Sequence, residues 1–384
     1  MGSTATRLGV SAALVAGQWI KGDVALEGNR LVSIGLAPAV GSKVVVSGFV
    51  DHQINGFAGV DFRTADESEY ARACEALLAT GVTRFNPTLY SSSIDQYCDA
   101  LGVLAQVHRR PPSGAWALGA HLEGPFLSRV WKGAHDPELL VDPNPLVVER
   151  LLRAGPVDLI TVAPELPGAM DLIADLVAEG VRVSIGHSDA SASQCREAVD
   201  AGASMITHVF NAHRRFAPRD PGPAAVALTD DRVSVGVIAD GVHLDVDTLR
   251  LIARSASDRM VLVTDAIAPA GLASVSWADR WERREGDERR VAYRESASEW
   301  ESAPARVTVI DGAARLNDGT LAGSVATMDA CVRRMIGLGV SSKVVLNAAG
   351  ANRLRLGRSV DFVVLDDQWQ VLDAYPEEHS TPVS

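Results

Sequence analysis

Polar residues able to bind a metal or move a proton follow several apolar stretches of this 384-residue chain. They stand where each stretch ends: Gln53, Asn55, His121, Glu123, His187, His208, Asn211, Asp240, His243 and Asp265. The stretches are short, rich in Val and Ile, and separated by helical patterns, which is typical of buried parallel strands. Because the carboxyl ends of parallel strands meet at one face, we expect these side chains to share one active site.

Three of these positions form a candidate metal site. Glu123, His187 and His208 supply one carboxylate and two imidazoles from three separate strand ends. A lone His is more often a packing residue, but this joint donor set suits one divalent metal with a position open for water. Zinc is the first expectation, with iron, manganese or cobalt as alternatives. Asp265 is a carboxylate at the same rim, where its alternative role is the N-cap of a following helix.

The elements that must position these residues follow from the same pattern. About eight strand-and-helix units occupy residues 47–349, which predicts a (β/α)8 TIM-like barrel of the α/β class. An open doubly wound sheet is the alternative, but no GxGxxG follows the first strand, so its dinucleotide-binding version has no support. Residues 1–46 and 350–384 alternate like hairpins, which predicts one small β-sandwich domain built from both ends of the chain.

A charged segment at about 274–308 departs from the barrel pattern. It contains Trp277, Trp281 and Trp300 among many Arg and Glu residues. A mixed charge run of this kind is typical of a solvated surface insertion or hairpin. The three Trp side chains suggest that one of its faces packs on the barrel or on a partner subunit.

The composition excludes several classes of function. The chain has 48 acidic and 36 basic residues, for a formal net charge of −12, so we expect no general affinity for nucleic acid or anionic membranes. No apolar run reaches the roughly 18 residues of a membrane-spanning helix, and the N-terminus does not resemble a signal peptide. The four cysteines form no CxxC pair, which favours a cytoplasmic protein over a disulfide framework.

Several motifs, in chain order, resemble the N-acetylglucosamine-6-phosphate deacetylase family of the amidohydrolase superfamily. They run from about Gly48 to Met328 and read GFVDHQING, GAHLEGPF, KGAH, ITVAPE, IGHSDAS, THVFNA, RDPG, IADGVHLD, VTDAIAPAG and GTLAGS. The resemblance implies a metal-bearing barrel with a small β-sandwich formed by both termini. It also implies hydrolysis of N-acetyl-D-glucosamine 6-phosphate to D-glucosamine 6-phosphate and acetate, a step of amino-sugar catabolism.

The resemblance also implies a role for each matching residue. Glu123, His187 and His208 would bind one metal ion per subunit, and Asp265 would act as general base and then as general acid. The implied substrate-binding residues are Ala134, His135, Asn211, Ala212, Arg219, His243, Leu321, Ala322 and Gly323. Among these, Arg219 and His243 would hold the phosphate, with Arg219 reaching into the neighbouring site of a homodimer.

The chain departs from the resemblance at two places. Many amidohydrolases have His-x-His at the end of the first strand, whereas this chain has Gln53 and Asn55, which favours a single metal with the amides ordering water. His52 is expected to point away from the site because side chains alternate along a strand. His213 stands where the family usually has an apolar residue, as either a pocket variation or a surface side chain.

Two other functions are weighed against the deacetylase. A dihydroorotase-like cyclic amidase is disfavoured because the chain lacks His-x-His and has no Lys at a strand end suited to bridging two metals. A non-catalytic metal-binding or sugar-phosphate-sensing protein is disfavoured because the proposed ligands and Asp265 are all present. The sequence does not separate glucosamine from galactosamine substrates.

Overall fold

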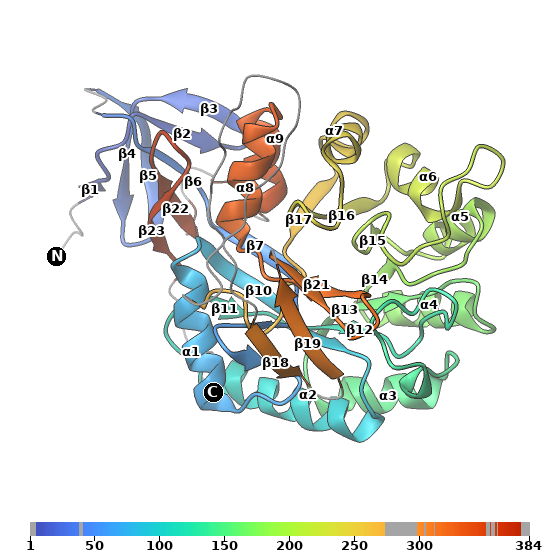
Figure 1. Cartoon of the computed structure of the whole chain (residues 1–384). Coiled ribbons are helices and arrows are strands. Elements are labelled where there is room, and N and C mark those ends of the chain that lie inside the picture. The colour runs from blue at the N-terminus through green and yellow to red at the C-terminus, as the bar shows by residue number, and fades with distance from the viewer. Residues whose placement is uncertain are drawn as a thin grey trace.

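The computed structural model describes residues 5–37, 41–272, 298–302, 305–310, 312–350, 354, 358 and 360–377. Trp277 and Trp281, with most of the insertion predicted at 274–308, lie outside the described residues. The predicted fold class is confirmed, because parallel strands form a nearly closed eight-stranded barrel and further strands form a small sheet domain (Figure 1).

The barrel consists of parallel strands that neighbour one another in chain order. They are β7 (Phe49–Ile54), β10 (Val82–Tyr90), β12 (Ala120–Glu123), β13 (Val157–Val162), β14 (Arg182–Ile185), β15 (Met205–Ile206), β16 (Ser234–Ile238) and β17 (Met260–Val263). The last strand returns to the first, because the Asp265 amide donates to the Gln53 carbonyl at 2.8 Å and the Asn55 amide to the Ala266 carbonyl at 2.7 Å. The short strand β11 (Trp116–Ala117) adds to β10 outside the ring.

Helices cover the outside of the barrel. They are α1 (Glu67–Leu78), α2 (Ile94–Arg109), α3 (Pro145–Ala154), α4 (Ala169–Ala178), α5 (Ala192–Asp200), α6 (Gly222–Thr229), α7 (Val246–Ser255), α8 (Met328–Gly337) and α9 (Ser342–Ala349), with the 3-10 turn η1 (Pro137–Leu139). Capping boxes start α1, α2 and α5, at Asp66, Ser93 and Ser191. Each cap contributes about 1 kcal/mol to its helix, so local sequence determines where these helices begin.

Strands from the two ends of the chain form a small sheet domain beside the barrel (Figure 1). One sheet joins β1 (Thr6–Arg7), β4 (Asp23–Glu27) and β5 (Arg30–Leu36), and the other runs β23 (Val371–Tyr375), β22 (Phe362–Leu365), β6 (Val44–Ser47), β2 (Ala12–Val15) and β3 (Gln18–Lys21). The central pair is antiparallel, with Phe362 opposite Ser47 and Leu365 opposite Val44. A separate apolar core, including Leu31, Val45 and Phe362, holds the two sheets together. The domain limits at residues 46 and 349 stay a proposal.

An antiparallel sheet interrupts the barrel pattern after β17. It contains β18 (Ser298–Ser302), β19 (Ala305–Ile310), β20 (Ala313–Arg315) and β21 (Leu321–Ser324), and it lies across the barrel in Figure 1. Its last strand is bound to the barrel rim, since the Ser324 amide donates to the Asp265 carbonyl at 2.8 Å and the Ile267 amide to the Ser324 carbonyl at 3.0 Å. The hairpin β8 (Gly56–Phe57) and β9 (Val60–Asp61) follows the first barrel strand.

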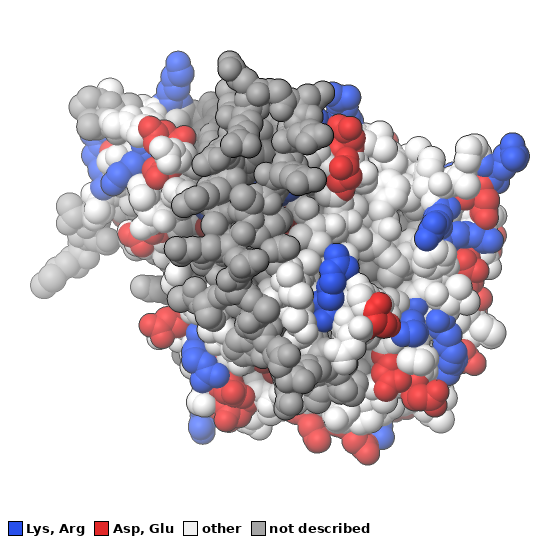
Figure 2. All heavy atoms as spheres, in the orientation of Figure 1, with Lys and Arg blue, Asp and Glu red and all other residues white. Residues whose placement is uncertain are grey.

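Figure 2 shows Lys and Arg interspersed with Asp and Glu on one face of the molecule, without a single basic patch among the coloured residues. Within the part of the chain that the structure describes, no helix combines the length and the apolar character needed to cross a bilayer.

Candidate active site

A cavity of about 350 Å³ opens at the carboxyl ends of the barrel strands. Its walls include all the predicted metal-binding, catalytic and substrate-binding residues except Arg219: Glu123, Ala134, His135, His187, His208, Asn211, Ala212, His243, Asp265, Leu321, Ala322 and Gly323. Asn55 also lines it, whereas the strand-end residues Gln53, His121 and Asp240 do not. Arg219 lies on the exposed loop before α6 and does not line the cavity of its own chain. Most residues of the strand-end pattern therefore share one cavity.

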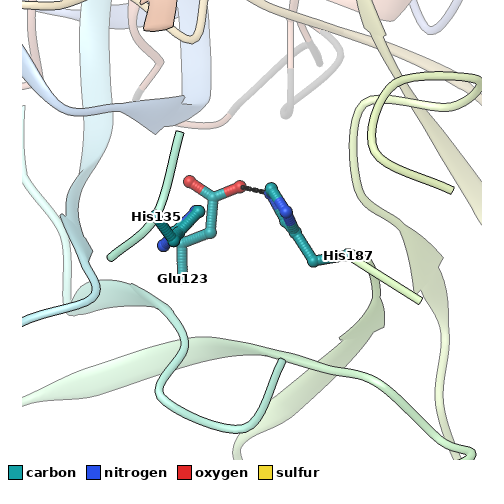
Figure 3. A group of neighbouring side chains, drawn as sticks. All are labelled: Glu123, His135 and His187. Carbon is teal, nitrogen blue, oxygen red and sulfur yellow. Dashed lines mark hydrogen bonds and ion pairs between the residues drawn. The ribbon is translucent and has the colours of Figure 1, made fainter. Parts of the chain in front are cut away.

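The three predicted metal ligands converge at the wall of this cavity. His187 Nε2 lies 3.1 Å from Glu123 Oε1, His208 Nε2 lies 2.9 Å from the same oxygen, and the two nitrogens are 3.1 Å apart. His187 Nδ1 lies 3.0 Å from the Trp131 carbonyl, which can only accept, so the proton of neutral His187 belongs on Nδ1. Its Nε2 lone pair then faces the carboxylate, and Figure 3 shows Glu123 and His187 directed at each other.

These residues fit a divalent cation. Lone pairs of the His nitrogens and a carboxylate oxygen, held about 3 Å apart, repel one another unless a positive charge lies between them. Metal bonds of about 2.0–2.2 Å bring N and O ligands to similar mutual distances. Without a metal, an imidazole that carries its proton on Nε2 can instead donate to Glu123. Burial alone would raise the pKa of Glu123, but such donation and positive charge on the His rings hold the pKa well below its usual range, so the carboxylate is ionised.

His135 also lies within ligand distance of this group. Its ligand atom, with those of Glu123 and His187, falls in a cluster whose members are within 4.8 Å of one another (Figure 3). However, His135 Nδ1 accepts from the Ser91 amide at 3.3 Å, and burial lowers the pKa of the ring to about 3. A neutral His135 therefore carries its proton on Nε2 and is a donor. We favour His208, whose Nε2 is in direct contact with the other two ligand atoms, as the third ligand.

Asp265 is held beside the metal ligands by two amides. Asn55 Nδ2 donates to Asp265 Oδ1 at 2.7 Å, and Gln53 Nε2 lies 3.3 Å from the same oxygen and 2.9 Å from Glu123 Oε1. Burial, with a further contribution from the negative charge of Glu123, raises the pKa of Asp265 to about 7. A bound cation would offset that negative charge. The two amides that were expected to order water therefore bond to the carboxylates: Gln53 to both Glu123 and Asp265, and Asn55 to Asp265.

The backbone is strained where it presents three of these side chains. His187, His208 and Asp265 have φ values of 47°, 24° and 50°, in the left-handed region that non-glycine residues seldom occupy. Such conformations cost about 1–3 kcal/mol each and cluster at functional sites. Hydrogen bonds to the carbonyls of all three residues hold the turns in place. With the backbone in this conformation, all three side chains line the cavity.

His243 lies at another wall of the cavity, bound to a buried carboxylate. Its Nδ1 donates to Asp240 Oδ2 at 2.7 Å, and the other Asp240 oxygen accepts the amides of Val242 and His243 at 2.9 Å. Burial disfavours the charged ring, but the hydrogen bond and charge of Asp240 outweigh it and raise the pKa of His243. The result is an imidazolium that keeps its charge to a higher pH than an ordinary His.

Replacing Asp240 tests this electrostatic support. In Asp240→Asn we expect the pKa of His243 to fall, because the raising partner is lost while the burial remains. An anion that needs charged His243 should therefore begin to lose affinity at a lower pH than in the wild type. The measurement is the substrate KM against pH from 5.5 to 9, with His243→Asn as the control that lacks the titrating ring. Identical KM profiles for Asp240→Asn and wild type would contradict this role.

Some lining residues were not predicted from the sequence. Trp131 directly precedes the KGAH motif, and Tyr90 is the last residue of β10. The motif and the strand-end pattern could therefore have indicated both. Val307 comes from β19 of the inserted sheet, and Leu316 and Thr320 from the turn between β20 and β21. No local signal connects these residues with the cavity. Of the predicted insertion at 274–308, Val307 lines the cavity, and most of the rest lies outside the described residues.

Three of the histidines considered in the sequence analysis do not line the cavity. His52, as expected, points elsewhere, with Nδ1 2.7 Å from Asn86 Oδ1. His121, included among the strand-end residues, is buried, with Nε2 2.8 Å from Thr161 Oγ1. Both alternatives considered for His213 are wrong: it is 2% exposed and does not line the cavity. It packs behind His208, with Nε2 2.8 Å from the Thr207 carbonyl.

Known proteins provide an independent comparison with this geometry. No family model matches the chain. The N-acetylglucosamine-6-phosphate deacetylase of Rattus norvegicus is 36% identical over 87% of this chain and 82% of its own, and the N-acetylgalactosamine-6-phosphate deacetylase of Escherichia coli O157:H7 is 31% identical over 82% and 78%. A solved mutant N-acetyl-D-glucosamine-6-phosphate deacetylase from Mycobacterium smegmatis, in complex with N-acetyl-D-glucosamine-6-phosphate, superposes with a TM-score of 0.85 at 32% identity, over 97% and 98% of the two chains. The chain belongs to the N-acetylglucosamine-6-phosphate deacetylase family of the amidohydrolases.

Proposed function

We propose that this chain hydrolyses the acetamide of N-acetyl-D-glucosamine 6-phosphate to D-glucosamine 6-phosphate and acetate. The observation that carries the proposal is the buried group of Glu123, His187 and His208 beside Asp265, with Gln53 bonded to both carboxylates. A metal site next to a carboxylate of raised pKa is what amide hydrolysis needs, since it requires an activated water and a proton for the leaving amine.

The proton steps fall to Asp265. A divalent metal held by the three ligands would acidify a bound water and polarise the acetamide carbonyl. Asp265 takes the proton of the attacking water and then gives it to the sugar nitrogen as the C–N bond breaks. A carboxyl group whose pKa lies near neutrality can perform both transfers. His135, with its proton on Nε2, donates to the carbonyl oxygen as negative charge develops there.

The remaining cavity residues fit the sugar and its phosphate. We assign His243 to the phosphate, because the buried Asp240 keeps the ring charged. Asn211, Ala212 and Ala134 line the part of the wall where the sugar hydroxyls would lie. Leu321, Ala322 and Gly323 of β21 would close over the sugar ring. Zinc is the metal we expect, on the chemistry of two imidazoles and one carboxylate.

A homodimer would complete the phosphate site. Among the described residues, no Lys or Arg lines the cavity, although the phosphate of the proposed substrate is a dianion near neutral pH. Arg219 is exposed on a loop between His213 and Pro221, where a second subunit could receive it. A guanidinium binds phosphate through paired charge-assisted hydrogen bonds, so we assign Arg219 to the partner's site. The free cysteines are consistent with a cytoplasmic enzyme.

Subunit complementation tests the assignment of Arg219. Arg219→Met should lower kcat/KM about 100-fold, with most of the effect in KM, because a bidentate phosphate contact is lost. Mixing it with Asp265→Asn, itself inactive, and exchanging subunits should restore about a quarter of wild-type activity, since half of the dimers then hold one intact site. Arg215→Met, on the same exposed loop, is the matched control. Failure of exchanged dimers to regain activity would place Arg219 in its own subunit's site or outside catalysis.

A comparison of three substrates tests the proposed function and distinguishes the two sugar epimers. Acetate release should be measured with the 6-phosphates of N-acetylglucosamine and N-acetylgalactosamine and with unphosphorylated N-acetylglucosamine. The proposal expects the first to give the highest kcat/KM and the third to be at least about 100-fold poorer, because it lacks the phosphate contacts. Release of no acetate from any of them by the metal-loaded protein would overturn the proposed function.

A further inference from the structure

The two His ligands differ in what supports their second ring nitrogen. His187 Nδ1 donates to the Trp131 carbonyl at 3.0 Å. His208 Nδ1 is buried and has no hydrogen-bond partner among the described residues. Metal-binding His residues almost always donate their other N–H to a carboxylate, a carbonyl or a water, which fixes the ring orientation and raises its basicity. His208 therefore needs an acceptor that its protein neighbours do not directly supply.

His213 is the side chain placed to complete this arrangement. Its ring centroid lies 6.0 Å from that of His208, with the planes at 68°, and its Nδ1 is also buried without a partner among the described residues. His213 Nε2 lies 2.8 Å from the Thr207 carbonyl, which only accepts, so Nε2 must carry the proton. The Nδ1 atom of neutral His213 is then an acceptor.

The tautomers of the two rings are complementary. If His208 binds metal through Nε2, its proton is on Nδ1, which becomes a donor. With its proton on Nε2, facing the Thr207 carbonyl, the His213 ring keeps the lone pair on Nδ1. The rings make no direct hydrogen bond, but a water bonded to each nitrogen at about 2.9 Å can bridge rings at this separation.

We propose that His213 is a positioning residue for the metal site: through one buried water, its Nδ1 accepts the Nδ1 proton of His208 and fixes that ring as a metal ligand. The proposal rests on the metal site of the proposed function but on none of its substrate contacts. It also accounts for a polar ring in a fully enclosed position that touches no part of the cavity. The strained backbone of His208, with φ at 24°, makes a second support for this ring more important.

Two substitutions distinguish the effect of losing the Nδ1 acceptor from the effect of losing the packing of the ring. His213→Leu fills much of the space and removes the Nδ1 acceptor. His213→Asn also loses the bond to the Thr207 carbonyl, but its Oδ1 can take the place of Nδ1 as acceptor. The readouts are Zn²⁺ affinity by competition with a chelator and the visible spectrum of the Co²⁺ protein. Thermal unfolding of the metal-free proteins reports whether each variant folds.

We expect His213→Leu to bind Zn²⁺ at least about tenfold more weakly and to change the Co²⁺ spectrum, while His213→Asn stays within about threefold of wild type. Equal affinities for all three proteins, or an equal loss in both variants, would overturn the proposal, because the acceptor would then make no difference. A wild-type protein that binds no metal would instead refute the metal site itself.

A measurement on the wild type does not depend on either variant folding. In the ¹⁵N spectrum of the Zn²⁺ protein, His208 should be protonated on Nδ1 and His213 on Nε2. The opposite tautomer of His213 would overturn the proposal, since its Nδ1 would then be a donor facing another donor.

Discussion

Asp265→Asn is expected to lower kcat by about 10³–10⁴-fold while the protein still binds one metal ion per subunit. The substitution keeps the size of the side chain and an Oδ1 atom that can accept from Asn55 and Gln53. It removes the carboxylate that would take a proton from water and return it to the leaving amine. KM should change little, because Asp265 acts on the reacting atoms rather than on the phosphate.

Metal content and kinetics should be measured on the same preparation of Asp265→Asn. Asn55→Ala is the useful comparison, since it removes a partner of Asp265 and leaves the carboxylate in place. We expect a smaller loss of kcat in that variant, by about 10-fold. Near-normal turnover of Asp265→Asn at full metal occupancy would show that another group moves the proton.

The same substitution has an opposite effect on stability. Because burial raises the pKa of Asp265 to about 7, the folded metal-free protein disfavours the ionised carboxylate. The resulting loss of stability is absent below the unfolded pKa of about 3.9 and grows as the pH rises to about 7. Metal-free Asp265→Asn should therefore unfold at a higher temperature than metal-free wild type at pH 8, and the difference should disappear near pH 4.

The barrel and most of its site could be predicted because both follow from local patterns. Continuous Val and Ile runs mark strands buried on two faces, and a polar residue at the end of each run is directed to the rim by the fold itself. Glu123, His187 and Asp265 were accessible to this reasoning. Sequence motifs then separated them from strand-end residues such as His121, which is turned away from the cavity.

What could not be predicted depends on contacts between distant segments. The wall formed by Val307 and Leu316 exists because β21 bonds to the barrel rim at Asp265, and nothing in either segment's own sequence indicates that pairing. The place of His213 is a similar case. Its loop turns back against the barrel, with the Ser188 amide bonded to the Ala212 carbonyl at 3.2 Å, so a residue in a polar-looking segment becomes fully buried.

The metal ion is expected to be essential for turnover. Dialysis against a chelator should abolish acetate release, by more than about 10⁴-fold, and stoichiometric Zn²⁺ should restore it. Glu123→Gln should reproduce the loss without a chelator. The substitution takes the negative charge from the centre of the ligand group, where Oε1 faces both His nitrogens at 2.9 and 3.1 Å. The amide left there binds transition metals poorly.

Metal binding should also be visible as stability, independently of turnover. A ligand at about 1,000 times its Kd stabilises the folded state by about 4 kcal/mol, which for a chain of this length raises Tm by roughly 5 °C. We expect that shift for wild type and for Asp265→Asn, whose ligands are intact, and no shift for Glu123→Gln. A Zn²⁺-dependent Tm in Glu123→Gln equal to that of wild type would place the metal elsewhere. Turnover that survives complete metal removal would exclude a mechanism in which Glu123, His187 and His208 hold an essential cation, whatever the Tm shows.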